Sequence, residues 1–252
     1  FTILIKLGLL RNYSIIGGAV NLFTRPRRFG KTLNMSMMEH FFSLNEDKRI
    51  LDGLKISKEA ALIKEFMGKY PVISVSLKGI DARNYELAFQ MAVQIMKRVP
   101  AKVQYLLKSD ALSEQDKAEY QKLLDDNMSE AVFCNSLRVL SELLEKHHGR
   151  KVILLMDEYD VPLAKAHENG YYGQMISLIR GFLGETLKTN NSLKFAVLTG
   201  CLRISKESIF TGLNNLKVMT VADERFDEYF GFTDEEVKGL LEYYDIMDHY
   251  GA

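Results

Sequence analysis

Three consecutive residues with phosphate-binding chemistry stand near the start of the chain. Gly30, Lys31 and Thr32 follow a short apolar run, 20–23, and a connecting segment that is rich in cations. Apolar residues then recur at helical spacing. Strand, tight loop, Gly-Lys-Thr and helix is the order that a phosphate-binding loop requires. The N–H groups of such a loop and the positive end of the helix dipole converge on one spot, where an anion binds.

In this interpretation the Lys31 ammonium contacts the β- and γ-phosphates of a nucleotide from a solvent-facing crevice, and the Thr32 hydroxyl holds Mg²⁺. The common pattern has a further glycine five positions before Gly30, where this chain has Arg25 followed by Pro26. Glycine is usual there because it tolerates backbone angles that a β-carbon resists. Gly-Lys-Thr alone also fits an ordinary helix start with a solvated lysine, so support must come from elsewhere in the chain.

Two adjacent carboxylates close the most apolar segment of the chain. Five consecutive apolar residues, 152–156, predict a strand that is buried on both faces, as parallel sheets require. Asp157 at its end is placed to coordinate Mg²⁺, and Glu158 to orient and deprotonate an attacking water. Either acid alone fits a solvated loop position. Together with the Gly-Lys-Thr segment, however, they favour a site that hydrolyses a nucleotide.

A further apolar strand is predicted at 193–199, and it ends in a hydroxyl group. Because ligands bind beyond the carboxyl ends of parallel strands, Thr199 is a candidate sensor of the γ-phosphate. The alternative is a hydroxyl that pairs with nearby backbone. Arg203 follows four residues later and is a candidate for stabilising transition-state charge, in its own site or in that of a neighbouring subunit. A surface ion pair is the alternative for Arg203.

The loop as a whole carries four cations within seven residues, Arg25, Arg27, Arg28 and Lys31. These cations either contact nucleic acid or balance a bound triphosphate and the acids near Asp157. Lys+Arg and Asp+Glu both number 33, so the formal net charge is zero. Because a dedicated nucleic-acid binder is strongly basic, we favour the second explanation and do not expect direct nucleic-acid binding. The residues expected to surround the nucleotide are Arg25, Pro26, Arg27, Arg28, Phe29, Gly30, Lys31 and Thr32.

Composition limits the class of protein. The 252 residues are 47% apolar, enough to bury a substantial core in one α/β domain, expected over 1–252. Cys134 and Cys201 form neither a disulfide framework nor a metal-binding motif, so we expect a reducing cytoplasm. No stretch reaches the ~18 apolar residues of a membrane span, and no membrane association is expected. Residues 1–10 are expected to pack on the core as a helix or strand.

Periodicity and turn residues predict the other elements. The mostly polar helical region at about 81–148 is the expected insertion, and a C-terminal helical region begins at about 233–252. A connector is expected from Pro100, and capping boxes are expected at Ser113/Asp116 and Thr233/Glu236. Helices are predicted at 31–43, 57–69, 85–98, 130–148, 171–187 and 235–244, and additional short strands at 71–76 and 218–221.

Four segments carry a resemblance to a known family. Phe23–Thr32, Asp157–Pro162, Thr199–Ser208 and Phe230–Thr233 resemble the corresponding motifs of the bacterial predicted AAA-ATPase-like family. The resemblance implies a P-loop NTPase core, a three-layer α/β/α fold around a mostly parallel five-stranded sheet of order 5-1-4-3-2. It also implies that Arg25 in the loop is a family trait. Members often continue into a PD-(D/E)XK nuclease-like domain, which is not expected within this chain, so no nuclease function is inferred.

Two classes of function follow from these residues. The first is an ATPase that hydrolyses ATP to ADP and phosphate with Mg²⁺ and drives a conformational switch in a partner domain or protein. The second is a nucleotide-binding or interaction module with little or no turnover. The pair Asp157-Glu158 favours the first class, and Arg25 in the loop favours the second.

Overall fold

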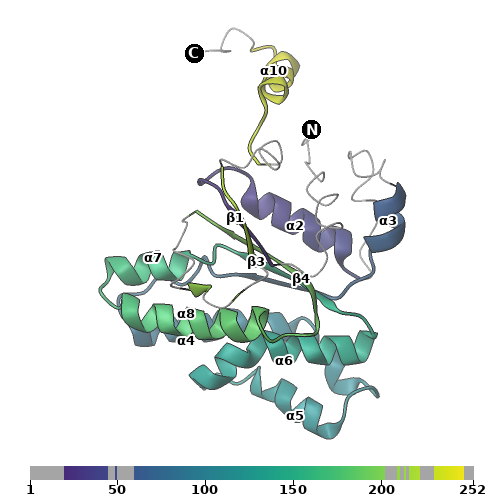
Figure 1. Ribbon diagram of the computed structural model, residues 1–252, viewed down its shortest axis with the longest axis vertical. Helices are drawn as coiled ribbons and strands as arrows, with labels where there is room; N and C mark the ends of the chain where they lie inside the picture. The colour runs from purple at the N-terminus through teal and green to yellow at the C-terminus, as the bar shows by residue number, and fades with distance from the viewer. Residues whose placement is uncertain are drawn as a thin grey trace.

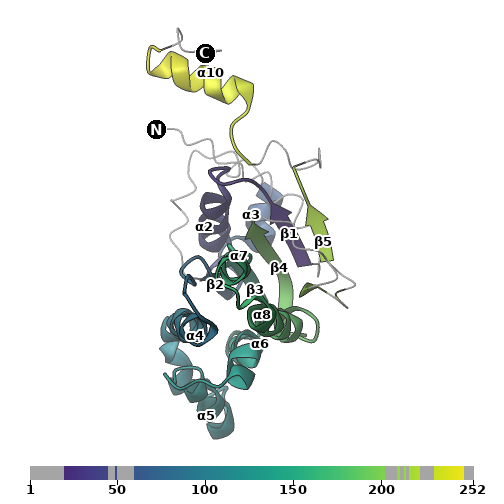
Figure 2. The ribbon, with the colours of Figure 1, turned by 90° about the vertical axis from the view of Figure 1, so that its left-hand side faces the viewer.

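The computed structural model describes residues 20–44, 49, 60–201, 209–210, 213, 216–221 and 230–246 (Figure 1). The expectations for residues 1–19 and for Arg203 lie outside these ranges. The described residues form a central sheet with helices on both faces, as Figure 1 and the perpendicular view in Figure 2 show.

Five parallel strands make up the sheet, in the order β2-β3-β4-β1-β5. Read from its other edge, this is the order 5-1-4-3-2, so the predicted three-layer α/β fold is confirmed. The predicted strand at 193–199 is the central strand of the sheet, and the predicted strand at 152–156 lies beside it. The strand bounds are β1 (Val20–Thr24), β2 (Val72–Ser76), β3 (Val152–Asp157), β4 (Leu193–Gly200) and β5 (Leu216–Met219).

The apolar strands divide the core into two layers, because successive side chains point to opposite faces of a sheet. In β3, Ile153 and Leu155 pack with α2 (Lys31–Phe42) and α3 (Ala60–Phe66). Leu154 and Met156 pack on the other face. The elements whose residues join that second layer are α4 (Tyr85–Ala101), η3 (Gln104–Lys108), α5 (Glu114–Lys122), α6 (Glu130–His148), α7 (Val161–Glu168) and α8 (Tyr172–Leu187).

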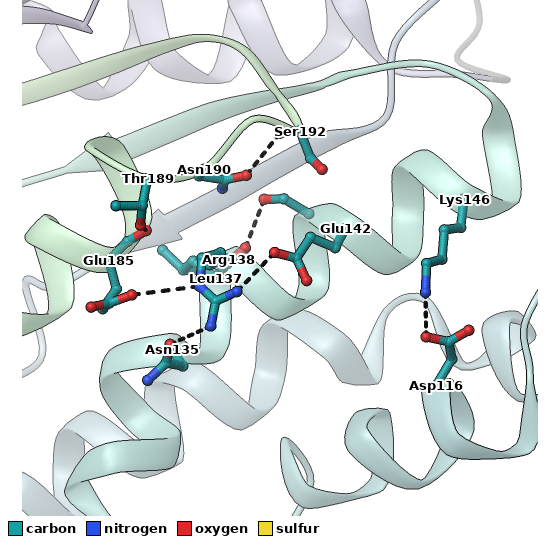
Figure 3. Close-up of polar contacts among 11 residues, drawn as sticks. Asp116, Asn135, Leu137, Arg138, Glu142, Lys146, Glu185, Thr189, Asn190 and Ser192 are labelled. Atoms are coloured by element: carbon teal, nitrogen blue, oxygen red, sulfur yellow. Dashed lines mark hydrogen bonds and ion pairs between the residues drawn. The ribbon is translucent and has the colours of Figure 1, made fainter.

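Polar contacts brace the helices of this second layer (Figure 3). Arg138 of α6 bonds the Glu142 carboxylate at 2.8 Å and lies 3.5 Å from that of Glu185 on α8. Lys146 of α6 pairs with Asp116, which completes the predicted capping box of Ser113 at the start of α5. The helical layer is therefore held together by contacts of its own, on the face of the sheet opposite α2.

The last described helix, α10 (Asp234–Tyr243), begins with the predicted Thr233/Glu236 capping box. None of its residues is buried. Figures 1 and 2 show it standing apart from the sheet and its helical layers. No helix within the described ranges is long and apolar enough to span a membrane.

Three details of the sequence-based assignment are wrong. The connector expected from Pro100 is the last turn of α4, which continues one residue past the proline, and the Pro100 carbonyl accepts the Tyr120 hydroxyl. The fifth strand lies two residues earlier than 218–221, because pairing with β1 aligns Val20 with Leu216. Helix α7, with Pro162 in its first turn, was not predicted, although proline is common at that position.

Candidate functional site

The candidate site lies at the carboxyl edge of three neighbouring strands, β3, β4 and β1. Phe23 of β1 is in register with Thr199 of β4, and Met156 of β3 with Leu198 of β4. The prediction that Phe23, Met156 and Thr199 lie at adjacent strand ends is therefore confirmed. Loops that follow these strands meet at the place where parallel sheets bind ligands.

The loop between β1 and α2 has a tightly curled backbone. Arg28 and Gly30 have left-handed backbone angles, with φ of 69° and 72°. A β-carbon at Gly30 would meet nothing within 4 Å, so glycine serves the backbone conformation there and not a close contact. The residues Pro26, Arg27, Arg28, Phe29 and Gly30 are exposed at this edge.

Lys31 is folded back into this loop. Its ammonium donates to the carbonyl oxygens of Arg25, at 2.9 Å, and Pro26, at 2.8 Å, and lies 3.3 Å from the Cys201 sulfur. The residue is only 6% exposed, so the expectation of a solvent-facing crevice is wrong. A buried ammonium needs acceptors, and the loop's own carbonyls supply them.

Thr32 connects the loop to the acid at the end of β3. Its hydroxyl donates to Asp157 Oδ2 at 2.6 Å, across 125 positions of the sequence. The Thr199 hydroxyl donates to Asp157 Oδ1. Both oxygens of this buried carboxylate therefore accept hydrogen bonds, which charge makes stronger than neutral ones. Thr199 pairs here with a carboxylate, a partner that neither sequence-based interpretation included.

Glu158 follows in a strained conformation. Its φ of 55° lies in the left-handed region. This conformation is energetically unfavourable for a residue that has a β-carbon. Residues that adopt it are concentrated at functional sites. Two contacts hold the segment after it. The Tyr159 N–H donates to the Thr199 carbonyl at 3.2 Å, and Asp160 accepts from the Cys201 N–H at 2.9 Å. The ends of β3 and β4 are thus tied together around the half-buried Glu158 side chain.

Gly200 permits this close approach of β3 and β4. A β-carbon at Gly200 would lie 2.6 Å from Tyr159 Cε1 and 2.7 Å from Asp160 Oδ1, both on fully packed side chains. The sequence motif around Thr199 contains Gly200, but the spacing of residues could not show that Tyr159 and Asp160 pack against Gly200.

Replacing Gly200 by alanine is expected to lower the free energy of unfolding by about 1–3 kcal/mol, because the added methyl overpacks the site. Gly184 of α8 is the matched control, since a β-carbon there meets nothing within 4 Å. Gly184→Ala should raise stability by up to about 1 kcal/mol through helix propensity. Urea unfolding curves for the two variants measure both effects. Equal stability of the Gly200→Ala protein and its parent would contradict the packing described here.

The arginines of the loop divide into two kinds. Arg27 and Arg28 are exposed, as expected of cations that meet an anion from solvent. Arg25 is only 3% exposed, and its Nη1 donates to the carbonyls of Thr24 and Met219, each at 3.0 Å. Its Cζ lies 4.9 Å from the centre of the Phe230 ring, a cation–π distance. The sequence alone predicts the same role for all three arginines, whereas the structure separates the buried Arg25 from the two exposed ones.

The donor set of the site fits Mg²⁺. Mg²⁺ prefers oxygen ligands and commonly uses one or two protein groups together with phosphate and water, and Thr32 and Asp157 present hydroxyl and carboxylate oxygens side by side. Within the described part of the chain, no group of three or more His, Cys, Asp or Glu residues could hold a metal by itself. Phosphate and water oxygens would supply the other ligands.

A loop of this kind on a parallel sheet of this order defines the P-loop class of α/β fold. Residues 13–210 match the family described as Predicted AAA-ATPase, and the chain belongs to that family, a nucleotide-binding class. A similar curated protein is described as an uncharacterized protein in the vnfD 5′ region of Azotobacter chroococcum mcd 1. It is 25% identical over 231 residues, which cover 89% of this chain and 38% of that protein.

Proposed function

We propose that this chain binds ATP together with Mg²⁺ at the carboxyl edge of β1, β3 and β4 and hydrolyses the ATP to ADP and phosphate. The observation that supports it most is the hydrogen bond from Thr32 to Asp157, which joins the phosphate-loop segment to a strand-end acid. Chance matches to Gly-Lys-Thr have no reason to lie against such an acid. The family match supports the nucleotide-binding part of the proposal.

Each residue of the site has a proposed task. The loop N–H groups and Lys31 bind the phosphates, and the exposed Arg27 and Arg28 add positive charge. Thr32 and Asp157 hold Mg²⁺, which when bound neutralises charge on the phosphate oxygens. Thr199, through its bond to Asp157, holds that carboxylate in place, and as a polar group at a strand end it is also the candidate γ-phosphate sensor.

Glu158 is the proposed general base. A carboxylate beside the phosphate-binding edge can accept a proton from the attacking water, so that the oxygen gains nucleophilic character as the phosphate bond breaks. Its left-handed backbone supports the assignment, because such strain persists where function requires it. Arg203 keeps its proposed role in stabilising transition-state charge.

A nucleotide-binding module with little turnover is the second candidate. It is favoured by one observation: no contact among the described residues fixes the Glu158 carboxylate in an orientation for catalysis. In both cases we propose that the nucleotide state acts on a partner domain or protein in the cytoplasm.

Asp157→Asn tests the proposed site. In the parent, Mg²⁺ is expected to strengthen ATP binding, and the variant should lose most of that increment, on the order of 10–100-fold in affinity for the metal-bound nucleotide, because one metal ligand has lost its charge. Calorimetric titrations with ATP, with and without Mg²⁺, measure it. Asp110→Asn, an exposed acid at 110 beyond η3, is the control and should behave as the parent. The same Mg²⁺ increment in Asp157→Asn and parent would remove Asp157 from the site.

A further inference from the structure

A segment from the far end of the described chain lies against the phosphate loop. The Phe230 side chain, 5% exposed, packs with its ring centre 5.2 Å from that of Phe23, the residue before the last of β1. The N–H of Gly231 donates to the carbonyl oxygen of Phe29 within the loop at 3.2 Å. The loop is therefore held from outside as well as by its own hydrogen bonds.

Arg25 is the centre of these contacts. Its guanidinium bonds the Met219 carbonyl at the end of β5 and faces the ring of Phe230. Its backbone N–H donates to the Gly200 carbonyl at 3.1 Å, and its own carbonyl accepts from Lys31. One residue thus touches β5, β4, the segment at 230 and the lysine proposed to bind phosphate.

The geometry at Gly231 shows how close this approach is. Its φ is 77°, and a β-carbon there would lie 3.3 Å from Phe29 Cδ1. Two residues later, Thr233 and its capping box with Glu236 begin α10. Phe232 between them is 66% exposed. The segment 230–233 therefore contacts the phosphate loop at one end and leads into α10, which stands apart from the sheet (Figure 1), at the other.

We propose that Arg25 is a positioning residue that couples the order of the phosphate loop to the order of residues 230–233. In place of the usual loop glycine, its buried side chain fixes the start of the loop against β5 and Phe230. Contact of Lys31 with phosphate would alter its bonds to the carbonyls of Arg25 and Pro26. Nucleotide binding and the anchoring of α10 then influence each other reciprocally, as linked equilibria must. The coupling to nucleotide rests on the ATP binding proposed above.

The positioning role is testable without nucleotide, by hydrogen exchange in the free protein. Arg25→Met and Phe230→Leu should each speed exchange of the Gly231 amide, which bonds the Phe29 carbonyl, and of the nearby Thr233 amide by about tenfold, because a charged hydrogen bond or its aromatic partner is lost. The double variant should exchange no faster than either single variant, because each single substitution already removes the same contact between Arg25 and Phe230. Phe232→Leu is the matched control and should change nothing.

Two further readouts exclude simpler roles. The amides of β3 should keep their exchange rates in all variants, because a general loss of stability would speed them as well. Arg25→Lys retains the charge but not the planar fork, so it should resemble Arg25→Met in the exchange of the Gly231 and Thr233 amides. Parent-like exchange in Arg25→Lys or Arg25→Met, or additive effects in the double variant, would overturn the positioning role.

Saturating Mg·ATP then tests the coupling. Exchange at 231–233 should slow several-fold in the parent and remain unchanged in Arg25→Met at an ATP concentration that saturates that variant. ATP binding in the parent is measured separately by titration. If ATP binds and exchange at 231–233 does not change, the coupling is overturned and the proposed function stands. If ATP does not bind, the proposed function fails, and the free-protein experiment still decides the role of Arg25.

Discussion

Replacing Glu158 by glutamine is expected to lower the rate of ATP hydrolysis by on the order of 10²–10⁴-fold, the usual contribution of a general base. Glutamine keeps the size of the side chain but cannot accept the proton of the attacking water. Because the proposed phosphate contacts come from the loop and Lys31, the affinity for ATP should stay within a few-fold of the parent value. Phosphate release at saturating ATP, measured beside an affinity titration, separates the two effects.

Glu86→Gln is the matched control, an exposed glutamate in the first turn of α4. It should hydrolyse ATP at the parent rate. If the parent binds ATP but releases phosphate no faster than the Glu158→Gln protein, the hydrolytic role fails. The chain would then be a nucleotide-binding module.

Replacing Lys31 by alanine should weaken ATP binding by on the order of 10²-fold or more, because charge-assisted bonds to phosphate are lost. Mg·ATP at 100 times the parent dissociation constant should stabilise the parent by ~2.7 kcal/mol. In a domain of this size that raises the melting temperature by about 5–10 °C. In the Lys31→Ala protein at the same ATP concentration, the shift should fall to about 1–2 °C or less.

The burial of Lys31 adds a second expectation. Without nucleotide, Lys31→Ala removes the donor from two loop carbonyls and should melt a few degrees below the parent. Each protein is therefore compared with its own nucleotide-free melting temperature. Lys188→Ala, an exposed lysine after α8, controls for the loss of a charge. Equal stabilisation of the parent and Lys31→Ala by Mg·ATP would show that Lys31 does not bind phosphate and only begins an ordinary helix.

The fold class could be predicted because interior strands of the sheet are recognisable in the sequence as apolar runs. The uninterrupted apolar run of β3 has no polar face, so it must be covered on both sides, and helices on both sides follow. The order of the strands came from the family resemblance and not from the pattern. The bounds of β5 could not be predicted, since pairing with β1 sets them and its own residues do not.

The site was only partly visible in the sequence. Gly-Lys-Thr and Asp157-Glu158 could be singled out because each follows a predicted strand, and parallel strands bring their carboxyl ends together. The sequence could not show that Arg25 is buried while Arg27 and Arg28 are exposed. The burial of Arg25 depends on its packing against Phe230, which is remote in the sequence. The direction of the Lys31 side chain also depends on carbonyls that only the folded loop presents.

Protection of Cys201 from alkylation tests the location of the ATP site most directly. The Cys201 sulfur lies 3.3 Å from Lys31 Nζ, whereas burial, with help from nearby carboxylates, raises the pKa of the Cys134 thiol to about 11 and slows its labelling. Mass spectrometry after brief treatment with N-ethylmaleimide reports each cysteine separately. Saturating Mg·ATP should slow the labelling of Cys201 by about tenfold or more and leave that of Cys134 unchanged. An unchanged rate at Cys201, with bound ATP demonstrated by titration, would place the nucleotide elsewhere and contradict the site proposed for this chain.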